Sequence, residues 1–293
     1  TTYNTPFHSV FLVTLKKIIN LFQMELFFSL SGFLFFYTTQ KKFKIKSLLK
    51  KKTIRLLIPF LLIGLFYLIP IRFIANYPPY ESTSLIRIIY SFLTVNDCGH
   101  LWFLPTLLGI FIIATVLIRM TKSKQSTLIC IVLMLYILSP YLSSFLLITS
   151  TKYLFFFFMG YFINQYGKQI FSIKAIYHGL ATLGILLIAY VLIFHNENRV
   201  VTTFTSITII ASLYYFMPHR TNRFILWLDK NSFGIYLFHS PLMYIIMNKF
   251  SIIAPPAILV PMNLIFGIGG SLIITYFLRA IKCSFVIGEK NDR

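Results

Sequence analysis

The chain has 293 residues, of which 57% are hydrophobic and only 12% are charged. Soluble domains are about half apolar and about a quarter charged, so this composition excludes an ordinary water-soluble protein. The net charge of +20 would suggest a nucleic-acid partner, but most Lys and Arg residues lie between apolar runs and no RNA- or DNA-binding motif is present. The charge instead indicates membrane topology and contact with anionic membrane lipid, and we expect no nucleic-acid binding.

Apolar runs recur along the chain at about the 20-residue length that a helix needs to cross a bilayer. The predicted transmembrane helices are residues 18–37, 54–75, 101–119, 128–149, 153–164, 173–194, 200–217, 232–248 and 257–279. The fifth run is the shortest. Together they predict an all-α, polytopic membrane helix bundle with about nine visible transmembrane helices, and residues 1–293 are expected to form a single membrane-embedded domain.

A strongly basic loop follows the first predicted helix. Its cations are Lys41, Lys42, Lys44, Lys46, Lys50, Lys51, Lys52 and Arg55. By the positive-inside rule this loop faces the cytoplasm, which also places the C-terminus in the cytoplasm and residues 1–17 outside the plasma membrane. The sequence shows no signal peptide before the first helix. We therefore expect a tenth helix upstream of Thr1, which would bring both ends of the protein to the cytoplasm.

Cysteine spacing and the standard enzyme motifs give no sign of a metal or of soluble-type chemistry. Cys98, Cys130 and Cys283 are far apart and form neither a CxxC pair nor a Cys/His metal pattern, so we expect no disulfide and no metal. GxSxG, HExxH and Walker A motifs do not occur in a usable context. Candidate chemistry must therefore come from polar residues at membrane depth, where ionisable groups are costly and often functional.

The first predicted helix carries two such candidates. Glu25 lies about two turns into the helix from its outer end, too deep to reach water fully. It could pair structurally with an Arg or a buried hydroxyl, or it could serve in substrate binding or proton handling. Ser31, next to Gly32, forms a small pair among large aromatic residues, which suits either close helix packing or the approach of a slim ligand.

Later segments supply further candidates. His100 and Trp102 lie where the longest outer loop meets the third predicted helix, and they could serve in acid–base chemistry and substrate contact or simply be a solvated ring and an interfacial anchor. Tyr236 and His239 are three residues apart and share a helix face, where they could line a polar cavity or make only interhelical hydrogen bonds. Arg55 could be a positive-inside anchor or a fork for phosphate at the cytoplasmic mouth.

Four segments resemble, in order, motifs of one family. Residues 27–34 (FFSLSGFL) resemble the FFxxSGF(L) segment of the acyltransferase-3 family of bacterial multi-pass membrane acyltransferases. As in that family, a basic loop and residues 55–60 (RLLIPF) follow. Residues 101–104 (LWFL) and 233–239 (FGIYLFH) resemble its LWFL and GIYLxH segments. Each motif consists of common membrane residues, but their order and spacing along the chain make the resemblance specific.

The resemblance implies a membrane acyltransferase. Such an enzyme would move an acyl group, commonly acetyl, from cytoplasmic acyl-CoA as donor substrate to a hydroxyl of a surface or lipid-linked glycan. A basic inner face could receive the anionic CoA, and an outer loop with His100 could meet the glycan. A general base would activate the acceptor hydroxyl, with His239 and Tyr236 as candidate supporting groups. A non-enzymatic glycan exporter or flippase is the alternative, and dependence on acyl-CoA distinguishes the two.

The resemblance also implies a residue that this sequence does not contain. The family's first helix carries an Arg and, further on, a His that is thought to activate the acceptor, and residues 1–7 are similar to the segment that follows that His. The main catalytic His is therefore expected upstream of residue 1, and a chain without it is expected to be inactive. His8 is the fallback candidate for this role.

Overall fold

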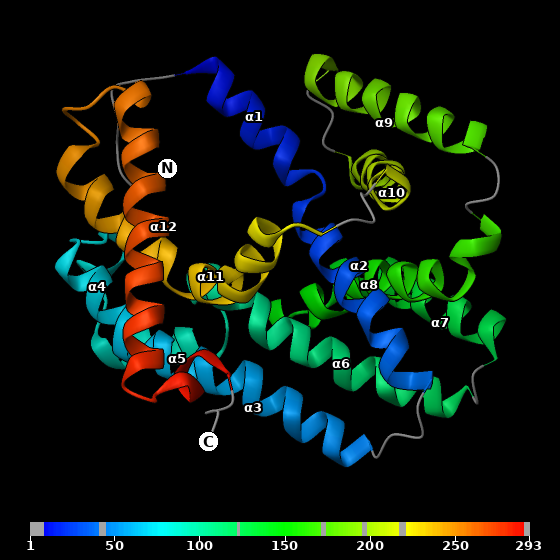
Figure 1. Ribbon diagram of the computed structural model, residues 1–293, viewed down its shortest axis with the longest axis horizontal. Coiled ribbons are helices and arrows are strands. Elements are labelled where there is room, and N and C mark those ends of the chain that lie inside the picture. The colour runs from blue at the N-terminus through cyan, green and yellow to red at the C-terminus, as the bar shows by residue number, and fades with distance from the viewer. Residues whose placement is uncertain are drawn as a thin grey trace.

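The computed structural model describes residues 9–40, 45–121, 124–170, 174–194, 198–216 and 221–289, and all regular structure in these ranges is helical (Figure 1). The α-helices are α1 (Val10–Asn20), α2 (Gln23–Gln40), α3 (Ile45–Ile63), α4 (Ile69–Ile74), α5 (Leu85–Leu93), α6 (Phe103–Met120), α7 (Gln125–Leu138), α8 (Phe145–Ile170), α9 (Lys174–Phe194), α10 (Arg199–Phe216), α11 (Arg223–Phe250) and α12 (Pro256–Ala280). A π-helix covers Gly64–Leu68, and 3-10 turns cover Pro78–Tyr80, Gly99–Trp102, Ser139–Tyr141 and Ser284–Ile287.

Seven helical stretches within the described ranges are long and apolar enough to cross a membrane. They are Val10–Thr38, Ser47–Ile74, Gly99–Met120, Phe145–Gly167, Ile176–Phe194, Arg199–Phe216 and Pro256–Ala280. The prediction of an all-helical membrane bundle is therefore confirmed. The predicted count of nine visible helices is not confirmed, because α7 is only a shorter apolar helix and α11 is not among the seven. The tenth helix expected upstream stays a prediction.

The predicted boundary between the fourth and fifth transmembrane helices is wrong. α7 ends at Leu138, and the 3-10 turn that follows contains Pro140, which has no N–H to continue a helix. α8 then begins at Phe145 and runs without a break to Ile170. The apolar run continues through this turn, so hydropathy alone did not mark the break. The segment predicted as the shortest helix is in fact part of a 26-residue helix.

Small residues let α2 and α8 pack closely. A Cβ added to Gly32 would lie 1.8 Å from the carbonyl oxygen of Phe157, and one added to Gly160 would lie 1.9 Å from that of Ser29. The side chain of Asn164 also donates to the Phe33 carbonyl at 2.7 Å. Glycine at both positions is therefore required for the backbones to approach. Two roles were considered for the Ser31–Gly32 pair, close helix packing and the approach of a ligand. Gly32 serves close helix packing.

Helix pairs arrange the rest of the bundle. α11 packs along α12, α9 along α10, and α6 contacts both α3 and α8. In Figure 1, α9 and α10 lie together at the upper right, whereas α4, α5, α11 and α12 occupy the left of the view. Gly234 of α11 faces Thr275 of α12, whose Oγ1 would lie 2.2 Å from an added Cβ. The middle of α11 contacts the turn that precedes α6, through the hydrogen bonds of Tyr236 and Leu237 with His100.

Candidate active site

The turn that carries His100 has an unusual backbone. Val95 and Gly99 adopt positive φ angles of 64° and 53°. A side chain at Gly99 would also clash, because its Cβ would lie 2.7 Å from Nη2 of Arg72. Only glycine combines that conformation with that space. The chain therefore turns sharply at Gly99 and directs His100 towards α11.

Pro241 explains why α11 can hold this turn. Proline inside a helix has no N–H, so the carbonyl four residues earlier, that of Leu237, lacks its usual helical partner. Nε2 of His100 lies 3.1 Å from this Leu237 oxygen. In return, the Tyr236 hydroxyl donates to the carbonyl oxygen of His100 at 2.7 Å. Two reciprocal hydrogen bonds thus dock the His100 turn on α11.

The hydrogen bonds determine which ring nitrogen carries the proton when each histidine is in its neutral form. A carbonyl oxygen only accepts, so Nε2 of His100 carries the proton and its Nδ1 holds a lone pair. Nδ1 of His239 lies 2.9 Å from the carbonyl oxygens of Ile235 and Tyr236, so this nitrogen carries the proton and Nε2 holds the lone pair. The ring centroids of His100 and His239 are 5.2 Å apart. Nδ1 of His100 is buried and has no hydrogen-bond partner among the described residues.

A buried cluster around Arg72 holds the loop before His100. The Arg72 side chain is only 1% exposed and donates to Asp97 at 2.9 Å and to the Tyr80 hydroxyl at 3.1 Å. It also donates to the Tyr244 hydroxyl on α11 at 3.4 Å and stacks over Tyr77, with its guanidinium carbon 4.4 Å from the ring centroid. Burial raises the pKa of Tyr77 and of Tyr80. The cluster therefore ties the His100 loop to the helix that carries His239.

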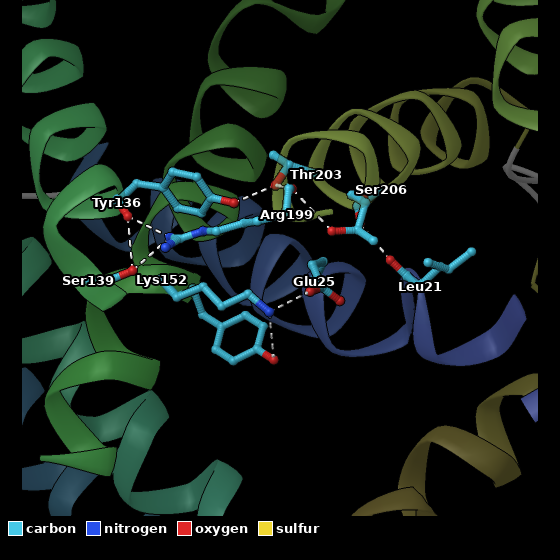
Figure 2. A network of polar contacts seen from close by, with 10 residues as sticks. Leu21, Glu25, Tyr136, Ser139, Lys152, Arg199, Thr203 and Ser206 are labelled. Carbon is cyan, nitrogen blue, oxygen red and sulfur yellow. Dashed lines mark hydrogen bonds and ion pairs between the residues drawn. The ribbon is translucent and has the colours of Figure 1, made fainter. Parts of the chain in front are cut away.

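Glu25 lies in a second polar cluster, drawn in Figure 2. Its Oε1 accepts from Nζ of Lys152 at 3.2 Å, and that Nζ lies 3.5 Å from the Tyr153 hydroxyl. Structural pairing, one of the interpretations of Glu25, is thus observed, with a lysine as partner. The other carboxylate oxygen, Oε2, is buried and has no partner in the described ranges of the chain. Beside this pair, Arg199 donates to Ser139 Oγ at 2.7 Å and to the Tyr136 carbonyl at 2.5 Å.

A continuous set of rings joins the two polar clusters. We call Tyr153, Trp102, Phe28, Phe103 and Tyr236 the aromatic wall. Ring centroids are 5.6 Å apart for Trp102 and Tyr153, 4.5 Å for Phe28 and Tyr153, 4.8 Å for Phe28 and Phe103, and 5.8 Å for Phe103 and Tyr236. Trp102 itself is partly exposed. The wall thus runs from the residue beside Lys152 to the residue that holds His100.

Two further predicted residues lie apart from the histidines. Arg55 is exposed, and its guanidinium carbon is 6.0 Å from the ring centroid of Phe233, one turn before Tyr236 on α11. Ser31 is partly exposed, and its hydroxyl donates to the Phe27 carbonyl of its own helix at 3.0 Å. Their substrate-binding roles stay predictions. His8 lies outside the described residues.

Sequence reasoning had not connected several of these residues with the site. Arg72 and Lys152 are not among the candidate residues predicted from the sequence. Each lies beside or within an apolar run, and that position for an ionisable residue was a usable signal. Tyr244 and Asp97 carried no signal of their own, because their roles depend on contacts between distant segments.

The chain belongs to the acyltransferase-3 family. The model of this family, described as an acyltransferase domain, matches residues 1–280. The resemblance drawn from the four motifs is thereby confirmed. No curated protein and no solved structure matches the chain. Membership supports a membrane acyltransferase, and it lends no support to the alternative of a glycan exporter or flippase.

Proposed function

We propose that this protein transfers an acyl group, in the first instance acetyl, from cytoplasmic acyl-CoA to a hydroxyl of a surface or lipid-linked glycan. Family membership supports the transferase class. The observation that carries the chemical assignment is the buried, unpaired Nδ1 of His100 beside His239. An unprotonated imidazole nitrogen without a donor is suited to accept the proton of an acceptor hydroxyl.

The reaction that this geometry supports is general-base-assisted acyl transfer. The acceptor hydroxyl donates to Nδ1 of His100, and its oxygen attacks the thioester carbonyl carbon. The new C–O bond forms, the C–S bond breaks, and the proton passes from the imidazole to the departing CoA thiolate. His239, whose Nε2 also holds a lone pair, is the second candidate base. Tyr236 acts through its hydrogen bond to the His100 carbonyl and is therefore a positioning residue.

Positively charged side chains on α3 support binding of acyl-CoA, the acyl donor. Arg55 of α3 contacts Phe233 of α11, which lies one turn before Tyr236 and about two turns before His239. Lys52 lies one turn before Arg55 on α3, with Nζ 4.2 Å from the ring centroid of Phe111. Two cations on one helix suit the phosphates of CoA. The basic residues of 41–55 also support a plasma-membrane protein with this face and its C-terminus in the cytoplasm.

The proposal is tested by measuring whether the protein adds O-acyl ester to surface glycan. The chain, expressed with whatever coding sequence precedes residue 1, is supplied with isotope-labelled acetyl-CoA in a host that lacks its own copy. Base-labile O-acyl groups on extracted surface glycan are then measured by mass spectrometry. Labelled ester that appears only with the protein supports the proposal. A well-expressed protein that yields no CoA-derived ester overturns it. The histidine expected upstream of residue 1 stays a prediction, and variants of that residue belong to the same experiment.

A further inference from the structure

Two buried acceptor atoms lie at the two ends of the aromatic wall and have no donor within the part of the chain that the structure describes. One is Nδ1 of His100, next to Tyr236. The other is Oε2 of Glu25, a residue only 7% exposed whose partner Lys152 contacts Tyr153. A carboxylate oxygen accepts and cannot donate, and leaving it without a donor in a buried position lowers stability. Both atoms therefore call for a ligand, or a water, that brings O–H or N–H groups.

The Lys152 ion pair does not by itself satisfy Glu25. Nζ of Lys152 lies 3.2 Å from Oε1, whereas no residue that the structure describes donates to Oε2. Arg199, the next cation in Figure 2, is directed away from Glu25 by its bonds to Tyr136 and Ser139. The Lys152 side chain is 35% exposed. An incoming group can therefore reach the cluster at Lys152. A purely structural pair would not need a buried free oxygen beside an open cation.

The surroundings match the chemistry of a sugar. A pyranose ring has an apolar C–H face that stacks on aromatic rings, and its edge carries hydroxyls that both donate and accept. Trp102 is partly exposed within the aromatic wall, and its ring centroid is 5.6 Å from that of Tyr153, whose hydroxyl Lys152 contacts. An aromatic face beside one acceptor and one donor is the usual composition of a pocket for a polar ligand.

We propose that Glu25, Lys152 and Trp102 form a binding subsite for a sugar residue of the acceptor glycan. A sugar hydroxyl donates to Oε2 of Glu25, Nζ of Lys152 donates to a neighbouring sugar oxygen, and the sugar ring stacks on Trp102. The inference rests on the proposed function and deepens it, because it assigns Glu25 to holding the acceptor rather than to moving protons. The acceptor would then extend along the aromatic wall, with another hydroxyl at His100.

The test separates acceptor binding from the chemical step. Membranes that carry the protein receive labelled acetyl-CoA and increasing amounts of surface glycan from the cell of origin, and labelled ester is measured at each glycan concentration. Glu25→Gln removes the charge and one acceptor site while keeping the side-chain volume. Glu81→Gln makes the same chemical change at an exposed position on the outer loop and is the matched control. Lys152→Met and Trp102→Leu test the other two members.

The expected result is a rise of about 10-fold in the glycan concentration for half-maximal transfer in Glu25→Gln, with the maximal rate within about twofold of the unmodified protein. Glu81→Gln is expected to change neither quantity. A folded Glu25→Gln variant with an unchanged half-maximal concentration, or with an equal loss at every glycan concentration, overturns the subsite and leaves the proposed function standing. If Glu25→Gln does not fold, Trp102→Leu decides by the same criterion. An unmodified protein that transfers nothing overturns both proposals.

Discussion

Nε2 of His100 lies 3.1 Å from the carbonyl oxygen of Leu237, although these residues are 137 positions apart in the chain. The carbonyl is available because the residue four positions further along α11 is Pro241, which has no N–H. A helix irregularity thus becomes the anchor for a candidate catalytic side chain.

Pro241→Ala should separate activity from stability. Alanine restores an N–H that competes with His100 for the Leu237 carbonyl, and it removes a proline that costs a helix interior about 3 kcal/mol. We expect acyl transfer to fall by about 10-fold or more while thermal stability stays equal or rises. Pro261→Ala, the same change inside α12, is the control. Unchanged transfer in a folded Pro241→Ala protein would show that the carbonyl anchor does not position His100.

Arg72→Met should destabilise the protein. It removes the buried cation of an ion pair whose carboxylate, Asp97, is 35% exposed, and it leaves the hydroxyls of Tyr80 and Tyr244 without their donor, so we expect a loss of about 1–3 kcal/mol. Thermal unfolding in detergent, followed by the loss of monodisperse protein, measures the effect. Arg87→Met, at an exposed position of α5, is expected to change stability by less than about 0.5 kcal/mol. Equal melting temperatures for the two variants would contradict a stabilising role for the cluster around Arg72.

Gly32→Ala should prevent close packing of α2 and α8. The added methyl would lie 1.8 Å from the Phe157 carbonyl oxygen, which belongs to a helix backbone and cannot move aside alone. The yield of folded protein in membranes, measured by size-exclusion chromatography after extraction, should drop sharply. Gly269→Ala introduces a methyl with no neighbour within 4 Å and is expected to fold normally. Normal yields for Gly32→Ala would mean that the helices are further apart than described.

Cys98 should resist alkylation at moderately alkaline pH. Burial, with a smaller contribution from the charge of Asp97, raises the pKa of the Cys98 thiol to about 12. The reactive thiolate is therefore scarce in the folded protein near pH 8, whereas an unfolded chain, with an ordinary thiol pKa of about 8.5, reacts readily. The folded state binds this proton more tightly, so its contribution to stability is full below about pH 8.5 and is lost as pH rises towards 12. Iodoacetamide labelling, read by peptide mass spectrometry with and without denaturant, tests this, and equal rates in the two states would contradict it.

The sequence was informative about local features and less so about long-range partners. Apolar run length predicted the membrane helices, and the three-residue spacing of Tyr236 and His239 predicted their shared face, with ring centroids 6.4 Å apart. The partner of Glu25 could not be predicted, since Lys152 is 127 positions away and approaches only through the α2–α8 packing. The same holds for His100 and α11, because nothing in the local pattern tells which distant carbonyl an imidazole will reach.

His100→Gln tests whether His100 takes part in acyl transfer. Glutamine keeps a donor for the Leu237 carbonyl and removes the basic nitrogen, so the turn can stay docked while the proton acceptor is lost. We predict that labelled ester formation from acetyl-CoA falls by about 100-fold or more, in line with the loss of a general base. His178→Gln, at an exposed position of α9, should transfer normally. A folded His100→Gln protein that transfers acetyl at an undiminished rate would show that His100 is not the general base.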